Sequence, residues 1–66
     1  MSEIEDDILK LLQERNKEMF ITEIGKSLNT SPTTVSKYLR ILEARGKVES
    51  NKKMPYIYWR IKKNGE

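Results

Sequence analysis

The sequence predicts a small α+β domain in which three helices precede an antiparallel β-hairpin. Apolar residues recur at helical spacing through most of the chain and alternate with period two near its end. Cap and turn residues separate these segments. The 66 residues, of which 36% are hydrophobic, suffice for one domain with a small core, and we expect this domain to span residues 1–66.

The first helix is predicted over Glu3 to Arg15. Its apolar residues form one stripe, at Ile4, Ile8, Leu11 and Leu12. Ser2 and Glu5 have the spacing of a capping box at its start. Asn16 tolerates the left-handed conformation that commonly ends a helix.

A short strand and a second helix follow. The apolar run 19–21 is too short for a helix and predicts a strand. Thr22 is then the expected N-cap of a helix that ends near Asn29, with Ile24 and Leu28 on its apolar face. At about two turns this helix is too short to be stable alone, so it must pack on its neighbours.

The third helix has the clearest boundaries, from Ser31 to Arg45. Ser31 is a strong N-cap, Pro32 fits the first helical position, and Gly46 supplies a stop. The apolar residues share one face or its flank: Val35, Tyr38, Leu39 and Leu42. The turn at residues 29–30 is so short that the second and third helices must cross sharply.

After Gly46 the sequence predicts a hairpin. Val48 opens its first strand, residues 51–55 form a loop with a basic tip, and residues 56–61 form the second strand. The second strand alternates, with Ile57, Trp59 and Ile61 on one side and Tyr56, Tyr58 and Arg60 on the other. We expect Trp59 to anchor the core rather than stack on a ligand, and residues 62–66 to be a frayed tail.

The composition excludes several classes of function. The chain has no cysteine and no histidine, which excludes disulfides, thiolate metal sites, Ser-His-Asp triads and nearly all zinc sites. The candidate acid/base carboxylates lie on or beside exposed parts of the first helix and form no pair in a pocket: Asp6, Asp7, Glu14 and Glu18. We therefore expect no enzymatic activity, no metal and no cofactor.

Nothing in the sequence predicts a membrane partner. No apolar run approaches the roughly 20 residues that span a bilayer, and the acidic N-terminus does not resemble a secretory signal. The sequence therefore predicts a soluble, cytoplasmic protein.

Charge is distributed unevenly along the chain. Residues 1–23 hold seven acidic and three basic residues, a balance of −4, whereas residues 24–66 hold ten basic and three acidic residues, a balance of +7. This segregation suggests a polyanionic partner for the second part of the chain. For an arbitrary small protein, a solvated, lysine-rich surface is the better explanation of this charge, and only the placement of the bases on the fold can overturn it.

The third helix gathers polar groups on one face. At about 100° per residue, four side chains cluster opposite the apolar stripe: Thr33, Ser36, Lys37 and Arg40. No acidic residue lies between them. Lys and Arg can donate to guanine O6 and N7, while Ser and Thr reach bases or phosphates. An ordinary solvated helix face explains this pattern equally well when it is taken alone. Together with the preceding turn and the basic wing, the pattern favours contact with a DNA major groove.

Further contacts with double-stranded DNA are expected around this face. Ser31 and Thr34 lie at the start of the third helix. Lys52 and Lys53 in the hairpin are candidate phosphate or minor-groove contacts, which supply affinity more than sequence choice. Thr22, with the free N–H groups of the second helix, is a candidate phosphate site.

Residues 22–39 and the segment 42–48 carry a family resemblance. They resemble the core and the start of the wing in winged helix-turn-helix regulators of the arsenical-resistance and multiple-antibiotic-resistance types. In that pattern a small residue stands at Gly25, where the helices approach, and a residue able to take positive φ stands at Asn29. The resemblance implies a repressor-like transcription regulator that holds helix 31–45 in the major groove and the 51–55 wing on the DNA backbone.

The oligomeric state is left open by the sequence. Members of those families usually dimerise through helices outside the winged core, and the sequence shows no such helix. We expect a monomer, a weak homodimer that pairs through the first helix, or one domain of a larger protein.

Two alternatives compete with binding to ordinary duplex DNA. Residues 28–61 also resemble the Z-alpha family, which binds Z-form nucleic acid. That family has Asn and Tyr where this chain has Ser36 and Arg40, and consecutive prolines where it has only Pro55. The other alternative is a protein-interaction or architectural module of a replication or transcription assembly, with Ile41 and Met54 as candidate members of an exposed apolar patch.

Overall fold

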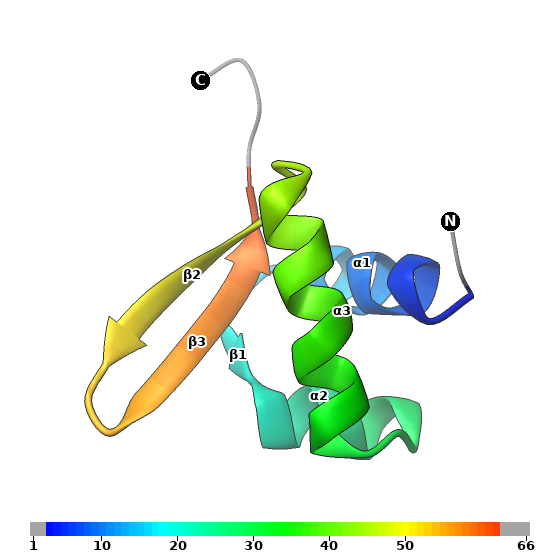
Figure 1. Ribbon diagram of the computed structural model, residues 1–66, viewed down its shortest axis with the longest axis horizontal. Helices are drawn as coiled ribbons and strands as arrows, with labels where there is room; N and C mark the ends of the chain where they lie inside the picture. The colour runs from blue at the N-terminus through cyan, green and yellow to red at the C-terminus, as the bar shows by residue number, and fades with distance from the viewer. Residues whose placement is uncertain (1–2, 63–66) are drawn as a thin grey trace.

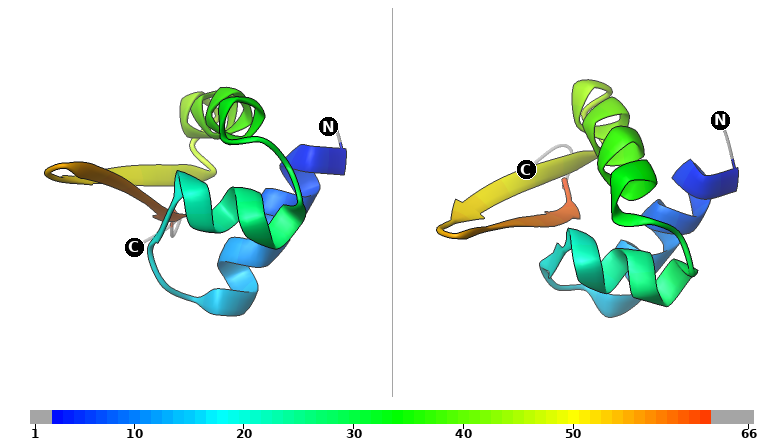
Figure 2. Two further views of the ribbon diagram at one scale, coloured as in Figure 1. Left: turned by 90° about the horizontal axis from the view of Figure 1, so that it is seen from below. Right: turned by 60° about the horizontal axis from the view of Figure 1, so that its bottom comes forward.

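The computed structural model describes residues 3–62 and confirms three helices followed by a hairpin (Figure 1). The elements are, in chain order, α1 (Glu3–Arg15), β1 (Met19–Phe20), α2 (Ile21–Leu28), α3 (Pro32–Ala44), β2 (Val48–Lys53) and β3 (Tyr56–Ile61). The helices pack together, and the hairpin extends away from them to one side (Figures 1 and 2). The proposed caps at Ser2 and most of the expected tail at 62–66 lie outside the described residues.

The three strands form one antiparallel sheet in the order β1-β3-β2. Residues that pair directly across antiparallel strands point to the same face. Trp59 pairs with both Met19 and Ser50, so these three share the face toward the helices, here called the inner face. Tyr58 pairs with Phe20 and Asn51, which therefore lie on the opposite, outer face.

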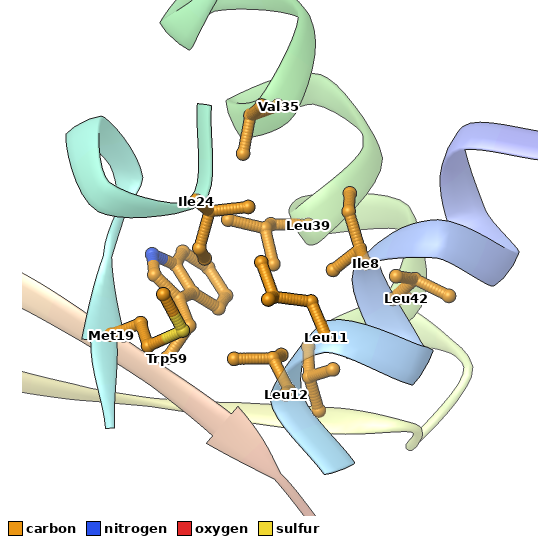
Figure 3. Packing of buried hydrophobic residues seen from close by; sticks show 10 residues of the cluster. Ile8, Leu11, Leu12, Met19, Ile24, Val35, Leu39, Leu42 and Trp59 are labelled. Carbon is orange, nitrogen blue, oxygen red and sulfur yellow. The ribbon is translucent and has the colours of Figure 1, made fainter. Parts of the chain in front are cut away.

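The inner face of the sheet packs against the three helices, and a compact apolar core lies between them. Its buried residues come from every element: Ile8, Leu11, Leu12, Met19, Ile24, Val35, Leu39, Leu42, Val48 and Trp59. Trp59 is only 5% exposed, and its ring lies beside Met19 and Ile24 (Figure 3). The expectation that Trp59 anchors the core is confirmed. Its indole Nε1 has no hydrogen-bond partner among the described residues.

The turn between α2 and α3 has the predicted geometry. Asn29 adopts a left-handed conformation with φ 53°, and the Thr30 N–H donates to the Gly25 carbonyl at 2.9 Å. A Cβ at Gly25 would stand 2.7 Å from the Thr30 carbonyl oxygen, so glycine is what permits this close approach. At the start of α3, the Thr34 N–H donates to Ser31 Oγ at 3.3 Å, which confirms Ser31 as the N-cap.

The start of α2 corrects a prediction, because Thr22 is not the N-cap. The helix begins at Ile21, and the N-cap Phe20 has extended φ and ψ of −98° and 165°. The Glu23 carboxylate caps the helix, since its Oε1 accepts from the Phe20 N–H at 3.2 Å. Thr22 lies exposed in the first turn, and Ile21 belongs to the helix rather than to the strand.

The hairpin corrects a second prediction. Residues 51–53 are not loop but strand, and only Met54 and Pro55 separate β2 from β3. The half of the hairpin next to the Met54–Pro55 connection reaches beyond the helices (Figure 1). Ile57 is therefore 39% exposed, although it lies on the inner face with Trp59.

Candidate nucleic-acid interface

The polar face of α3 lies opposite the core, as the sequence predicts. Val35, Leu39 and Leu42 are fully buried and fix the rotation of the helix against the core. The side chains on the opposite side are exposed or partly exposed: Thr33, Ser36, Lys37 and Arg40. Because the core side is anchored, the polar side is presented to solvent as one rigid strip.

The two cations of this strip are available to a ligand. Arg40 is exposed and makes no ion pair or hydrogen bond with residues 3–62. Lys37 is also exposed, and its Nζ lies 5.5 Å from the centroid of the Tyr38 ring. A cation–π contact at an exposed site is weak, of about 0.5–1 kcal/mol, so it orients the ammonium without neutralising it.

Two of the three hydroxyl groups at the start of α3, those of Ser31 and Thr34, already form hydrogen bonds within the domain. Ser31 Oγ accepts from the Thr34 N–H and also donates to Thr34 Oγ1 at 3.0 Å. Thr33, between them, is exposed and has no such partner among the described residues. Of the three hydroxyls, Thr33 is therefore the one most available for a new contact.

Thr22 lines an open hollow between α2 and the start of α3, of about 490 Å³. The hollow is lined by Thr22, Gly25, Lys26, Asn29, Thr30, Ser31 and Pro32. Lys26 is exposed and forms no ion pair with the described residues, so it adds a positive charge beside Thr22. The sequence analysis missed Lys26, although its spacing of four from Thr22 indicates that both occupy one face of a helix.

The structure separates the two wing lysines, where the wing is the hairpin of β2 and β3. Lys52 pairs with Ile57 and therefore shares the inner face with Ser50 and Trp59. Ser50 Oγ donates to Glu43 Oε2 on α3 at 2.9 Å, so this face of the wing is directed toward α3. Lys52 is exposed and without an ion pair in residues 3–62.

Lys53 has a different environment on the outer face. Its Nζ lies 2.7 Å from Oε1 of Glu18, the residue just before β1, and 5.4 Å from the centroid of the Tyr58 ring. The other carboxylate oxygen of Glu18 accepts from Asn51 Nδ2 at 2.9 Å. The hydrogen bonds from Lys53 and then Asn51 lower the pKa of Glu18, so the carboxylate is held in its charged form.

Other site types find no support in the described part of the chain. Residues 3–62 contain no group of three His, Cys, Asp or Glu side chains that could hold a metal ion. None of the described helices has the length and apolar character needed to cross a membrane.

Three helices, a sharp turn before a basic third helix, and a hairpin wing beside it define the class of winged helix-turn-helix DNA-binding domains. The family model for the HTH domain matches residues 5–58, and the chain belongs to this family. No curated protein matches the sequence significantly.

Solved structures agree with this class. The Adhesin competence repressor AdcR of Streptococcus pyogenes is 21% identical, with a TM-score of 0.85 over 96% of this chain and 48% of that one. The homodimeric winged helix-turn-helix domain of Mycobacterium bovis Mb0332, a possible ArsR-family regulator, is 29% identical, with a TM-score of 0.79 over 88% and 52%. This chain thus spans about half the length of each. The Zalpha domain of Carassius auratus PKZ, solved with Z-DNA, is 22% identical, with a TM-score of 0.78 over 88% and 90%.

Proposed function

We propose that this domain binds double-stranded DNA in a sequence-specific manner and acts as a cytoplasmic, repressor-like transcription regulator. The observation that carries the proposal is the strip of Thr33, Ser36, Lys37 and Arg40 on α3, which is open to solvent and contains no acidic residue. The wing lies beside α3 (Figure 1), and its strand β2 carries Lys52, which is exposed.

The proposed geometry assigns different tasks to α3 and the wing. An α-helix fits the major groove, where each base pair presents a distinct pattern of donors and acceptors, and Arg40 can donate two hydrogen bonds to guanine. Lys52 and Lys26, with Thr22, are suited to phosphates, which give affinity with little sequence information, whereas Lys53 is already paired with Glu18. Binding of the domain would then regulate transcription by occupying an operator.

Relatives suggest how the domain is used. One structural neighbour is described as a repressor and another as a homodimeric, possible ArsR-family regulator. We infer that residues 1–66 act as one DNA-binding unit, either alone or as a weak homodimer, and that the unit carries no enzymatic activity of its own.

Selection from random duplexes, followed by affinity measurements on the selected and random sequences, tests the proposal. We expect Arg40→Ala to weaken binding to the selected site by about 1–3 kcal/mol and to leave binding to random duplexes much less changed. Lys10→Ala, which removes an exposed lysine of α1, is the matched control and should leave selectivity unchanged.

Salt titration of the same complexes measures the electrostatic part. Each phosphate contact should contribute about 0.9 to the slope of log affinity against log salt concentration. An equal loss of affinity for selected and random sequences in Arg40→Ala would show a non-specific architectural binder instead. Undetectable binding to any duplex at low salt would rule out the proposal.

A second candidate is Z-form nucleic acid, because a Zalpha domain solved with Z-DNA has the same fold over 90% of its length. The side chains of α3 favour ordinary duplex DNA, since Ser36 and Arg40 stand where the Z-alpha resemblance has Asn and Tyr. Circular dichroism of alternating CG duplexes separates the two.

A further inference from the structure

Two neighbouring lysines of the wing occupy opposite faces of one strand. Side chains alternate along β2, so Lys52 points to the inner face, toward α3, and Lys53 to the outer face. Because Ser50 on the inner face hydrogen-bonds Glu43 of α3, a ligand bound to the exposed strip of α3 would meet the wing on its inner face. Lys52 and Lys53 therefore cannot make equivalent contacts with one DNA duplex bound there.

The outer-face lysine is already engaged by residues far away in sequence. One carboxylate oxygen of Glu18 accepts a hydrogen bond from Lys53 Nζ at 2.7 Å, and the other accepts one from Asn51 Nδ2 at 2.9 Å. Its side chain is 21% exposed, whereas that of Lys53 is 57% exposed, so the carboxylate is the better shielded partner. Both contacts run from β2 across the sheet to the residue that precedes β1.

These contacts tie the free end of the wing to the body of the domain. Lys53 is the last residue of β2, next to the two-residue connection, and β2 is an edge strand. Within residues 3–62, the other side-chain hydrogen bond that joins the wing to the rest of the domain is the one from Ser50 to Glu43 of α3, nearer the base of the wing. The Glu18 contacts thus restrain the distal half of the wing, which the helices do not cover.

We propose that Glu18 and Lys53 form a latch that positions the wing, and that Lys52 is the wing lysine that contacts the DNA backbone. The assignment rests on the proposed DNA-binding function. Glu18 is a positioning residue in this scheme: it contacts no DNA and acts by holding β2 at the angle that brings Lys52 to a phosphate.

The latch makes a prediction opposite in sign to that of simple electrostatics. Glu18→Lys adds positive charge to the wing region, which on charge alone should tighten DNA binding. If the latch positions the wing, Glu18→Lys instead places two lysines side by side, releases β2 and weakens binding to the selected duplex by about threefold or more. Adding Lys53→Glu restores an ion pair with reversed polarity and should return the affinity to within about twofold of wild type.

The experiment measures affinity and salt slope for wild type, Glu18→Lys and the charge-reversed double variant on one selected duplex. Glu14→Lys, at an exposed acidic residue of α1, is the matched control and should tighten binding slightly. Tighter DNA binding by Glu18→Lys would overturn the latch, because charge alone would then set the affinity. A double variant that binds at least tenfold more weakly than wild type would also overturn it, because Lys53 would then contact phosphate itself.

A second pair of variants keeps the test decisive if Glu18→Lys unfolds. Lys52→Met should flatten the salt slope by about 0.9 and weaken binding. Lys53→Met removes the partner of Glu18, so it should also weaken binding, and adding Lys52→Met to it should lower the affinity little further, because the released wing no longer holds Lys52 at a phosphate. Additive losses of affinity in this double variant would contradict the assignment, because each lysine would then contact phosphate independently. Failure of the wild-type chain to bind any duplex would overturn the proposed function itself, and the assignment with it, whereas the outcomes above overturn the latch alone.

Discussion

At the scale of single residues, Glu18 shows how a surface carboxylate in a small domain acquires a structural task. In the sequence, Glu18 stands out only as one of four acidic residues on or beside the first helix. Its partners, Asn51 and Lys53, lie 33 and 35 residues away, so no local pattern could have indicated them. They meet only because β1 and β2 flank β3 in one sheet.

The lowered pKa of Glu18 predicts a pH dependence of stability. A carboxyl whose pKa is depressed by folding stabilises the native state above its unfolded value, which is about 4.3, and this stabilisation is lost as pH falls through the lower native value. We expect wild type to melt at a higher temperature than Glu18→Gln by a constant margin from about pH 8 to pH 5. The margin should shrink toward zero in more acidic buffer.

Thermal melts of both proteins across this range, followed by circular dichroism, provide the measurement. Glu14→Gln serves as the control, and its melting temperature should track that of wild type at every pH. A margin between wild type and Glu18→Gln that survives in strong acid would mean that the charge of Glu18 is irrelevant.

Gly25 is a position where the backbone, rather than a side chain, imposes the residue. An added Cβ would stand 2.7 Å from the Thr30 carbonyl oxygen, which belongs to the main chain of a tight turn and cannot move freely. We expect Gly25→Ala to destabilise the domain by about 1–3 kcal/mol, even though Ala favours helices by about 1 kcal/mol. Urea unfolding gives the value, and Ser27→Ala, at an exposed site of α2, should change stability by less than about 0.5 kcal/mol. A neutral Gly25→Ala would show that the turn can open.

At the scale of elements, local signals predicted α1 and α3 well and failed at the start of α2. Ser31 and Pro32 act within one turn of the helix they begin, so their roles can be inferred from the sequence alone. Thr22 has a hydroxyl group that could cap a helix, but it lies within the first turn of α2 and not at the N-cap position. Phe20 pairs with Tyr58 in the sheet, and this long-range contact keeps Phe20 extended directly before Ile21.

Substitution of the two candidate caps tests this account. Ser31→Ala removes the acceptor of the Thr34 N–H and should destabilise the domain by about 1 kcal/mol. Thr22→Ala removes no cap and should change the free energy of unfolding by less than about 0.5 kcal/mol. Denaturant unfolding of both variants checks the prediction, and a cost for Thr22→Ala equal to that of Ser31→Ala would refute it.

The wing was only partly predictable for a related reason. Residues 51–53 are polar and have low strand propensity, which favoured a loop. They form strand because each has a partner in β3, from Asn51 with Tyr58 to Lys53 with Tyr56. The alternation of β3 placed Trp59 correctly, but periodicity gives only the face of a residue. It could not show that Ile57 lies beyond the helices that cover that face.

At the scale of the whole molecule, the acidic and basic parts of the sequence lie on different surfaces of the domain. The acidic residues of the first part lie largely on α1, while α3 and the wing carry free cations. The domain measures 32 × 30 × 21 Å, and one turn of B-DNA is about 34 Å long. Under the proposed function, one copy would therefore cover about one helical turn of duplex, the length of one half-site.

The fold alone does not choose between right-handed and left-handed DNA, because one structural neighbour was solved with Z-DNA. Under the proposed function the choice would depend on α3, where Arg40 can donate bidentately to guanine in the major groove of B-DNA and Ser36 offers a short hydroxyl beside it. We expect an alternating CG duplex to keep its B-form circular dichroism spectrum when the protein is added at several-fold excess. Ser36→Asn combined with Arg40→Tyr installs the two residues of the Z-alpha pattern on an unchanged fold and should shift the duplex toward the inverted spectrum. Inversion by the wild-type chain would show instead that the backbone of the fold and the wing suffice for Z-form recognition, and that the side chains of α3 do not decide it.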